Sequence, residues 1–150
     1  MPDKTILLVE DEPDDQLLTL KALRQQGVVN RVVLVRDGAA ALDYLFNPPS
    51  ARTSHRAPLP TLVLLDLNLP RVGGFEVLER IRAEERTARL PVVILTASED
   101  DEDAARGRAL GANAFVRKPL AFTDFARATR TLGFSWLLLK EAPSPEAPGL

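Results

Sequence analysis

Residues 6–15 read ILLVEDEPDD, an apolar run that stops at Glu10 and gives way to acidic residues. A short, continuous apolar run is typical of a strand buried on both faces, as strands of a parallel sheet are. Five of the last six residues in this stretch are acidic, and carboxylates at this density repel one another. A helix start relieves such repulsion through its dipole, and so does a bound cation. The sequence favours the helix start for Asp14 and Asp15, and the cation for Glu10 and Asp11.

The same alternation of apolar runs and helical patterns continues along the chain. Strands are expected at residues 6–9, 31–35, 62–65, 92–95 and 114–116. Helical patterns follow each of them, at residues 13–26, 38–46, 75–81, 102–110 and 122–132. Five strand–helix pairs predict an α/β fold, (βα)5, in which a doubly wound, five-stranded parallel sheet has helices on both faces.

The first helix is expected to begin at Pro13, which suits a first helical turn, and to stop at Gly27. Its apolar face is expected to be made by the leucines that follow at helical spacing, namely Leu17, Leu20 and Leu23 with Leu18. Gly111 is expected to close the fourth helix.

Two segments depart from the alternation and suggest the domain boundaries. Residues 47–60 are rich in proline and lack apolar periodicity, which indicates a surface loop insertion. Residues 133–150 begin with the apolar FSWLLLK and end in a proline-rich stretch typical of disorder. We therefore expect one domain over residues 1–132 and a C-terminal extension over residues 133–150.

Composition excludes several classes of protein. The chain has 19 Lys+Arg against 21 Asp+Glu, and this near-balance argues against nucleic-acid binding. It has no cysteine, which excludes disulfides, thiolate catalysis and cysteine-based metal sites. No apolar stretch approaches the length needed to cross a bilayer, and the N-terminus does not have the pattern of a signal peptide. The expected location is the cytoplasm.

The residues at the predicted strand ends indicate chemistry. Glu10 and Asp11 follow the first strand, Asp66 the third, Thr96 the fourth and Lys118 the fifth. The carboxyl ends of parallel strands meet at one edge of the sheet, where ligands bind near a topological switch point. Three carboxylates there suit Mg²⁺, and the metal with a lysine and a threonine suits a phosphoryl group. Asp66 could then act as a nucleophile that forms an aspartyl-phosphate.

Four segments carry a resemblance to a known family: ILLVEDE, LVLLDLNLPRVGGFEVL, PVVILTAS and GANAFVRKPL. In this order, over roughly residues 4 to 132, they resemble the receiver domain of two-component response regulators, which has a flavodoxin-like fold. The long loop before the third strand and the FSWLLLK segment are similar to stand-alone regulators paired with phytochrome-type sensor histidine kinases.

The resemblance implies a role for each strand-end residue. Asp66 would accept a phosphoryl group from a phosphohistidine of the kinase. Glu10, Asp11 and Asp66 would hold Mg²⁺, with the backbone carbonyl of Asn68 as a further ligand. Lys118 would pair with Asp66 or with the phosphate, and Thr96 would bond the phosphate on activation.

The resemblance also assigns residues around the acceptor. Asn68 and Ser98 would tune autodephosphorylation, and the bond before Pro119 would be cis. Phe115 stands at the aromatic switch position, where many family members have a tyrosine. Glu10 stands where many have an aspartate, and its extra methylene leaves direct and water-mediated metal contact both open. Gly73 and Gly74 would fit the tight turn before the third helix.

Signal output would pass through protein contacts. The face made by the fourth helix, the fifth strand and the fifth helix is the expected contact surface, and together with the C-terminal extension it would support a homodimer. No DNA-binding or membrane-binding element is expected.

Other interpretations remain for the same residues. A Mg²⁺-dependent phosphatase would need a second acid, commonly an aspartate two residues after the nucleophile, where this chain has Asn68. A docking domain that has lost phosphorylation would have no use for the complete set of strand-end residues. His55, the one histidine, lies in the proline-rich insertion and is expected to be solvated.

Overall fold

The structure, a computed structural model, describes residues 5–25, 28, 30–46, 59–97 and 100–118. The elements follow one another as β1 (Thr5–Val9), α1 (Pro13–Gln25), β2 (Arg31–Val35), α2 (Gly38–Phe46), β3 (Leu62–Asp66), α3 (Gly74–Ala83), the 3₁₀ helix η2 (Glu85–Thr87), β4 (Val92–Thr96), α4 (Asp101–Ala109) and β5 (Ala114–Arg117). The expected fifth helix, Ser98, Pro119, His55 and the C-terminal extension lie outside the described residues.

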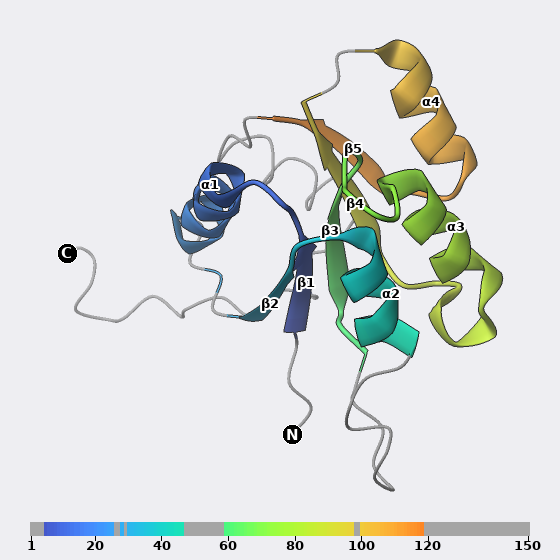
Figure 1. The fold of residues 1–150 in the computed structure, drawn as a ribbon, viewed down its shortest axis with the longest axis horizontal. Coiled ribbons are helices and arrows are strands. Elements are labelled where there is room, and N and C mark those ends of the chain that lie inside the picture. The colour runs from blue at the N-terminus through green and yellow to red at the C-terminus, as the bar shows by residue number, and fades with distance from the viewer. Residues whose placement is uncertain (1–4, 26–27, 29, 47–58, 98–99, 119–150) are drawn as a thin grey trace, which may run out of the picture.

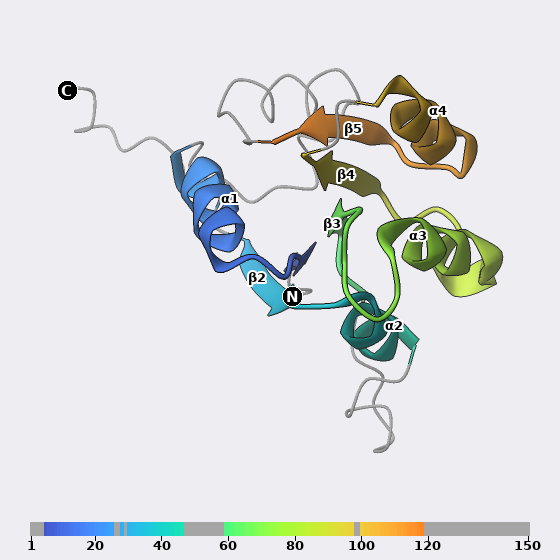
Figure 2. The ribbon, with the colours of Figure 1, turned by 45° about the horizontal axis from the view of Figure 1, so that its top comes forward.

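The strands form one parallel sheet in the order β2-β1-β3-β4-β5 (Figure 2). Each neighbouring pair is parallel, for example Val9 beside Leu65 and Asp66 beside Leu95. The predicted parallel α/β architecture is confirmed. Because the chain runs from β1 outward to β2 and then back across to β3, the switch point of the sheet lies between β1 and β3.

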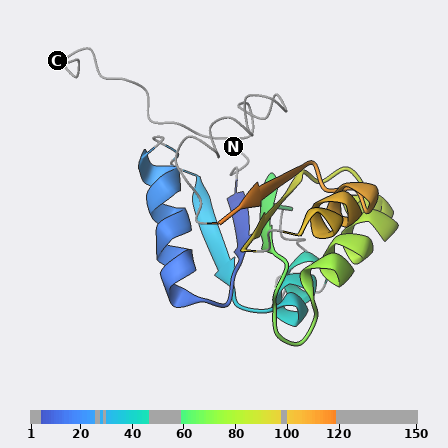
Figure 3. The same ribbon diagram turned by 90° about the horizontal axis from the view of Figure 1, so that it is seen from above.

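Helices cover the sheet on both sides. Figures 1 and 3 show α1 on one side of the sheet and α2, α3 and α4 on the other. Alternate residues of the strands face opposite layers, so Ile6 and Leu8 pack with Leu23 of α1, whereas Leu7 and Val9 belong to the other core.

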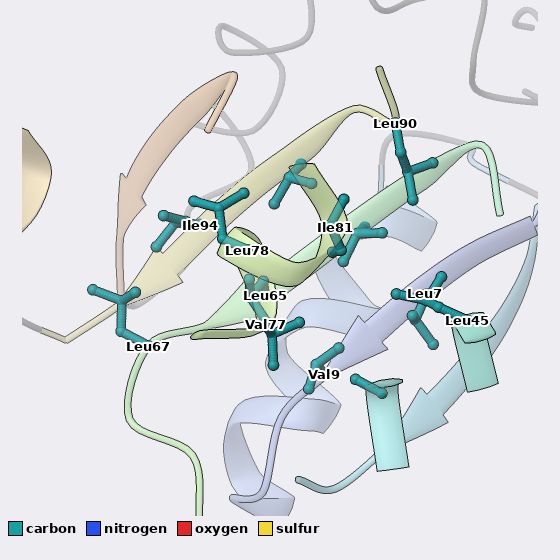
Figure 4. Close-up of a cluster of buried hydrophobic side chains, with 13 residues drawn as sticks. Leu7, Val9, Leu45, Leu65, Leu67, Val77, Leu78, Ile81, Leu90 and Ile94 are labelled. Atoms are coloured by element: carbon teal, nitrogen blue, oxygen red, sulfur yellow. The ribbon is translucent and has the colours of Figure 1, made fainter. Parts of the chain in front are cut away.

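The larger core lies between the sheet and helices α2 and α3. Figure 4 shows Leu45 of α2 and Val77, Leu78 and Ile81 of α3 directed toward the strands. Their strand partners include Leu7, Val9, Leu65 and Ile94. Strands β1, β3 and β4 are buried along their whole length, as the continuous apolar runs predict.

The predicted apolar face of α1 is wrong in two positions. Leu17 is 67% exposed and Leu18 is 46% exposed. The buried stripe of α1 is instead made by Gln16, Thr19, Ala22 and Leu23. Only one stripe of a helix can face a sheet. Gln16 on the buried stripe donates from its Nε2 to the backbone oxygen of Glu10 at 2.8 Å.

A half-buried arginine, Arg82, binds the backbone at the edge of the sheet opposite to the carboxyl ends of the strands. Arg82 Nη1 donates to the oxygen of Leu90 at 2.6 Å, and Arg82 Nη2 donates to the oxygen of Gly111 at 2.8 Å. Gly111 has a φ of 103°, which glycine adopts without strain after a helix end. Burial lowers the pKa of Arg82. Neither η2 nor the role of Arg82 was expected from the sequence.

None of the described helices has both the length and the apolar character that a bilayer crossing demands.

Candidate functional site

The predicted strand-end residues come together at the carboxyl edge of the sheet. Glu10 directly follows β1, Asp66 is the last residue of β3 and Thr96 is the last residue of β4. Lys118 directly follows β5, where its backbone N–H donates to the oxygen of Thr96 at 2.7 Å. The adjacent strands β1 and β3 therefore place Glu10 and Asp66 at the switch point.

Three carboxylates form a compact cluster at this edge. Glu10, Asp11 and Asp66 each offer an oxygen, and these oxygens all lie within 4.8 Å of one another. Glu10 and Asp66 are buried and Asp11 is half-buried. Like charges this close are stable only if they are protonated, paired or bridged by a cation.

Glu10 is fixed by its backbone and by one of its two side-chain oxygens. Its N–H donates to the oxygen of Val35 at 3.0 Å, and its Oε2 accepts from the N–H of Glu12 at 3.2 Å. Its Oε1 is buried and forms an ion pair with Lys118 Nζ at 2.5 Å. Burial raises the pKa of Glu10 to about 7, and the charge of Asp66 adds to the effect.

Lys118 supplies the positive charge. Its Nζ contacts Glu10 at 2.5 Å, Asp15 at 2.9 Å and Asp66 at 3.4 Å, and its side chain is 11% exposed. Burial alone would lower the pKa of Lys118, but the contacts with Glu10 and Asp15 and the charge of Asp66 raise it above its usual value. The ammonium is therefore always charged at the working pH.

Asp15 is the residue that sequence reasoning misplaced. The sequence assigns it with Asp14 to a solvated helix start, and Asp14 is indeed exposed. Asp15 instead turns inward, and its carboxylate accepts from Lys118 Nζ. Neighbouring residues on a helix point about 100° apart, so only one of the two aspartates can face the site. No sequence signal distinguishes Asp15 from Asp14, because the rotation of α1 that decides between them is seen only in the structure.

The segment after Asp66 depends on a glycine. A Cβ on Gly74 would lie 2.4 Å from the backbone oxygen of Asp66, so only glycine permits this approach. Gly74 N–H also donates to the oxygen of Leu67 at 3.0 Å. Desolvation raises the pKa of Asp66, while Lys118 and the N–H of Asn68 lower it, with a net upward shift. The loop thus holds the Asp66 carboxylate at the sheet edge.

The remaining predicted residues surround this centre. Thr96 is fully buried, and Phe115 of β5 is half-buried in the core on the α4 side. A Cβ on Gly107 of α4 would lie 3.4 Å from the Phe115 ring. Asn68 is exposed beside the acceptor. The coupling of Thr96 to Phe115 remains a prediction.

The residues of the cluster fit a hard divalent cation. Such ions prefer carboxylate and carbonyl oxygens. Among the described residues, four carboxylates, counting Asp15, gather around the single ammonium of Lys118. An added cation would balance this excess of negative charge.

Comparisons with known proteins agree with one another. The family model for the response regulator receiver domain matches residues 6–130. Response regulator Rcp1 from Synechocystis sp. is 35% identical over 136 residues, which are 91% of this chain and 90% of that protein. The probable methanogenesis regulatory protein FilR2 from Methanothrix harundinacea is 41% identical over 140 residues, covering 93% of this chain and 88% of that protein.

Two solved structures are similarly close. The bacteriophytochrome response regulator AtBRR has a TM-score of 0.80 and 45% identity, covering 94% of this chain and all of that one. The Mn²⁺-bound form of Rcp1 has a TM-score of 0.73 and 33% identity, covering 94% and 99%.

Proposed function

Because the chain belongs to the response regulator receiver domain family of two-component signalling, we propose that Asp66 is the residue that its partner kinase phosphorylates. Members of this family are phosphorylated on an aspartate and interact with sensor histidine kinases. The observation that carries the assignment is the position of Asp66. It is buried at the switch point, inside the acidic cluster and 3.4 Å from Lys118 Nζ.

The proposed reaction needs little covalent chemistry from the protein. An Asp66 carboxylate oxygen attacks the phosphorus of a phosphohistidine, a P–O bond forms as the P–N bond breaks, and the imidazole leaves with the bonding electrons and takes up a proton. Lys118 lies where it can neutralise a phosphoryl oxygen, and Thr96 can donate its hydroxyl to another. The catalysis is confined to phosphorylation and dephosphorylation of the chain itself.

We propose Mg²⁺ as the cofactor. Glu10, Asp11 and Asp66 would hold it through carboxylates, with the backbone carbonyl of Asn68 as a further ligand. When bound, the ion neutralises charge on the transferred phosphoryl group. The likeness to the Mn²⁺-bound form of Rcp1 supports a divalent ion at this cluster.

The switch and tuning roles extend the proposal. Thr96 would bond the phosphoryl group on activation, and Phe115 would change its packing with it. Asn68 and Ser98 would tune autodephosphorylation, and a cis bond before Pro119 would shape the turn after Lys118. The domain would span residues 1–132, including the 47–60 insertion, with residues 133–150 as an extension.

The proposed partner is a phytochrome-type sensor histidine kinase in the cytoplasm. The similarity to bacteriophytochrome response regulators supports this choice. Output would pass through the face formed by α4, β5 and residues 122–132, which with the extension would also form a homodimer. Nucleic acids and membranes are not among the proposed partners.

Phosphorylation from a small donor tests the central assignment. Acetyl phosphate with Mg²⁺ should add one phosphoryl group to the wild-type chain and none to Asp66→Asn, as measured by intact-mass spectrometry. Asp43→Asn, which changes an exposed aspartate of α2, is the matched control and should be modified like the wild type. Equal modification of Asp66→Asn would place the acceptor elsewhere.

A further inference from the structure

The ammonium of Lys118 is held by three carboxylates from three different elements. Glu10 follows β1, Asp66 ends β3, and Asp15 lies in the first turn of α1. The contacts measure 2.5, 3.4 and 2.9 Å respectively. The contact with Asp15 is a hydrogen bond, and the contacts with Glu10 and Asp66 are ion pairs.

Asp15 differs from the other two partners in one respect. Glu10 and Asp66 belong to the acidic cluster that suits a divalent cation, together with Asp11. Asp15 does not belong to that cluster, so among the described residues it is the partner of Lys118 that a bound cation would leave unengaged.

A cation in the cluster changes the forces on Lys118. It draws the oxygens of Glu10 and Asp66 and offsets their negative charge, so both attract the ammonium less strongly. A lysine side chain is long and flexible, so its ammonium moves away when the attraction of nearby carboxylates weakens. The ammonium nevertheless has to stay beside Asp66 if it is to meet an incoming phosphoryl group.

We propose that Asp15 is a positioning residue that keeps the Lys118 ammonium beside Asp66 while a divalent cation occupies the acidic cluster. This inference rests on the proposed function of Asp66 and assigns the device that orients Lys118. Asp15 does not contact the reacting atoms; it acts through Lys118.

The local structure equips Asp15 for this role. The next residue, Gln16, is buried and its Nε2 bonds the backbone oxygen of Glu10 at 2.8 Å. That bond connects the first turn of α1 to the end of β1, so the backbone that carries Asp15 is held in place. The Asp15 side chain is 31% exposed, which places it outside the most buried part of the site.

The chain offers a matched set of variants. Asp15→Asn removes the charge and keeps the shape, and Asp15→Glu restores the charge. Asp14→Asn makes the same charge change one residue earlier on the exposed side of the same helix turn. Urea unfolding of each variant would show that the fold is retained.

The first readout does not depend on phosphorylation. In the Mg²⁺-loaded chain, NMR of the lysine ammonium groups should show a slowly exchanging signal for Lys118. That signal should be lost by exchange broadening in Asp15→Asn, and kept in Asp14→Asn and Asp15→Glu. Affinity for Mn²⁺, measured by electron paramagnetic resonance, should differ by less than about twofold between Asp15→Asn and Asp14→Asn, which remove the same charge.

The second readout is the rate of phosphorylation by acetyl phosphate at saturating Mg²⁺. Asp15→Asn should slow it by about fivefold relative to Asp14→Asn, with Asp15→Glu recovering most of the rate.

The outcomes separate the two proposals. An unchanged Lys118 signal in Asp15→Asn, or a rate equal to or above that of Asp14→Asn, would overturn the role of Asp15 and leave Asp66 as the acceptor. A wild-type chain that acetyl phosphate does not modify would overturn the proposed function, whereas the Mg²⁺-loaded Lys118 signal would still decide whether Asp15 positions the lysine.

Discussion

At the scale of single residues, the site is dominated by the imbalance between carboxylates and one lysine. Glu10, Asp11, Asp15 and Asp66 carry up to four negative charges around Lys118. Burying such groups costs free energy unless they are paired, so the site without a cation is destabilising and depends on Lys118. This excess of negative charge favours the binding of a cation at the edge of the sheet, and the cation and Lys118 can then neutralise a phosphoryl group.

The dependence on Lys118 can be measured by replacing it. Lys118→Met removes the ammonium and keeps most of the apolar stem, and we expect it to lower the free energy of unfolding by about 1–3 kcal/mol without Mg²⁺, because Glu10 and Asp66 lose their counter-charge. At saturating Mg²⁺ the loss should shrink, since the ion supplies the missing charge. Urea unfolding with and without Mg²⁺ measures both values.

Lys21→Met is the control for this experiment, because Lys21 lies on the exposed side of α1. It should change the free energy of unfolding by less than about 0.5 kcal/mol in either condition. If Lys118→Met lost the same free energy at saturating Mg²⁺ as without it, packing and not charge would explain the loss.

At the scale of elements, the loop from β3 to α3 sets the position of Asp66 by backbone contact. Gly74→Ala would place a Cβ 2.4 Å from the Asp66 oxygen, and we expect a loss of about 2–4 kcal/mol in the free energy of unfolding. The displaced loop should also slow phosphorylation of Asp66. Chemical denaturation and the acetyl phosphate assay measure the two effects.

The neighbouring glycine provides a control within the same turn. Gly73 has a φ of −71°, and a Cβ there would have nothing within 4 Å. Gly73→Ala should therefore leave stability unchanged or raise it by up to about 1 kcal/mol. Equal losses in the two variants would contradict the contact argument.

Elements also show where sequence reasoning reaches its limit. The continuous apolar runs and their polar ends were enough to predict the sheet and to bring Glu10, Asp66, Thr96 and Lys118 to one edge, because parallel strands share that edge. The rotation of α1 about its own axis was not predictable from its leucines, because the buried stripe includes the polar residues Gln16 and Thr19 and leaves Leu17 and Leu18 exposed. The position of Asp15 follows from that rotation and was missed for the same reason.

At the scale of the whole molecule, the cluster links stability to pH and to divalent ions. Glu10 has a pKa of about 7 in the folded chain against an ordinary value of 4.5, and burial also raises the pKa of Asp66. Between pH 4.5 and about pH 7, the Glu10 carboxyl keeps a proton in the folded state that it has lost in the unfolded state. Stability of the metal-free chain should therefore be greatest at the acid end of the window and fall as pH rises through about 7.

Divalent ions should oppose this fall of stability with pH, because they bind the ionised carboxylates and compete with the proton. We expect the increase in Tm on adding Mg²⁺ to be small near pH 5 and several degrees larger near pH 8. Glu10→Gln cannot titrate at this position, so its metal-free Tm should fall less across the same window. Differential scanning calorimetry of both chains, with and without Mg²⁺, measures all four curves. A metal-free wild-type Tm that rises between these pH values would show that Glu10 and Asp66 are ionised in the fold, and the charge imbalance would then have to be relieved by Lys118 alone.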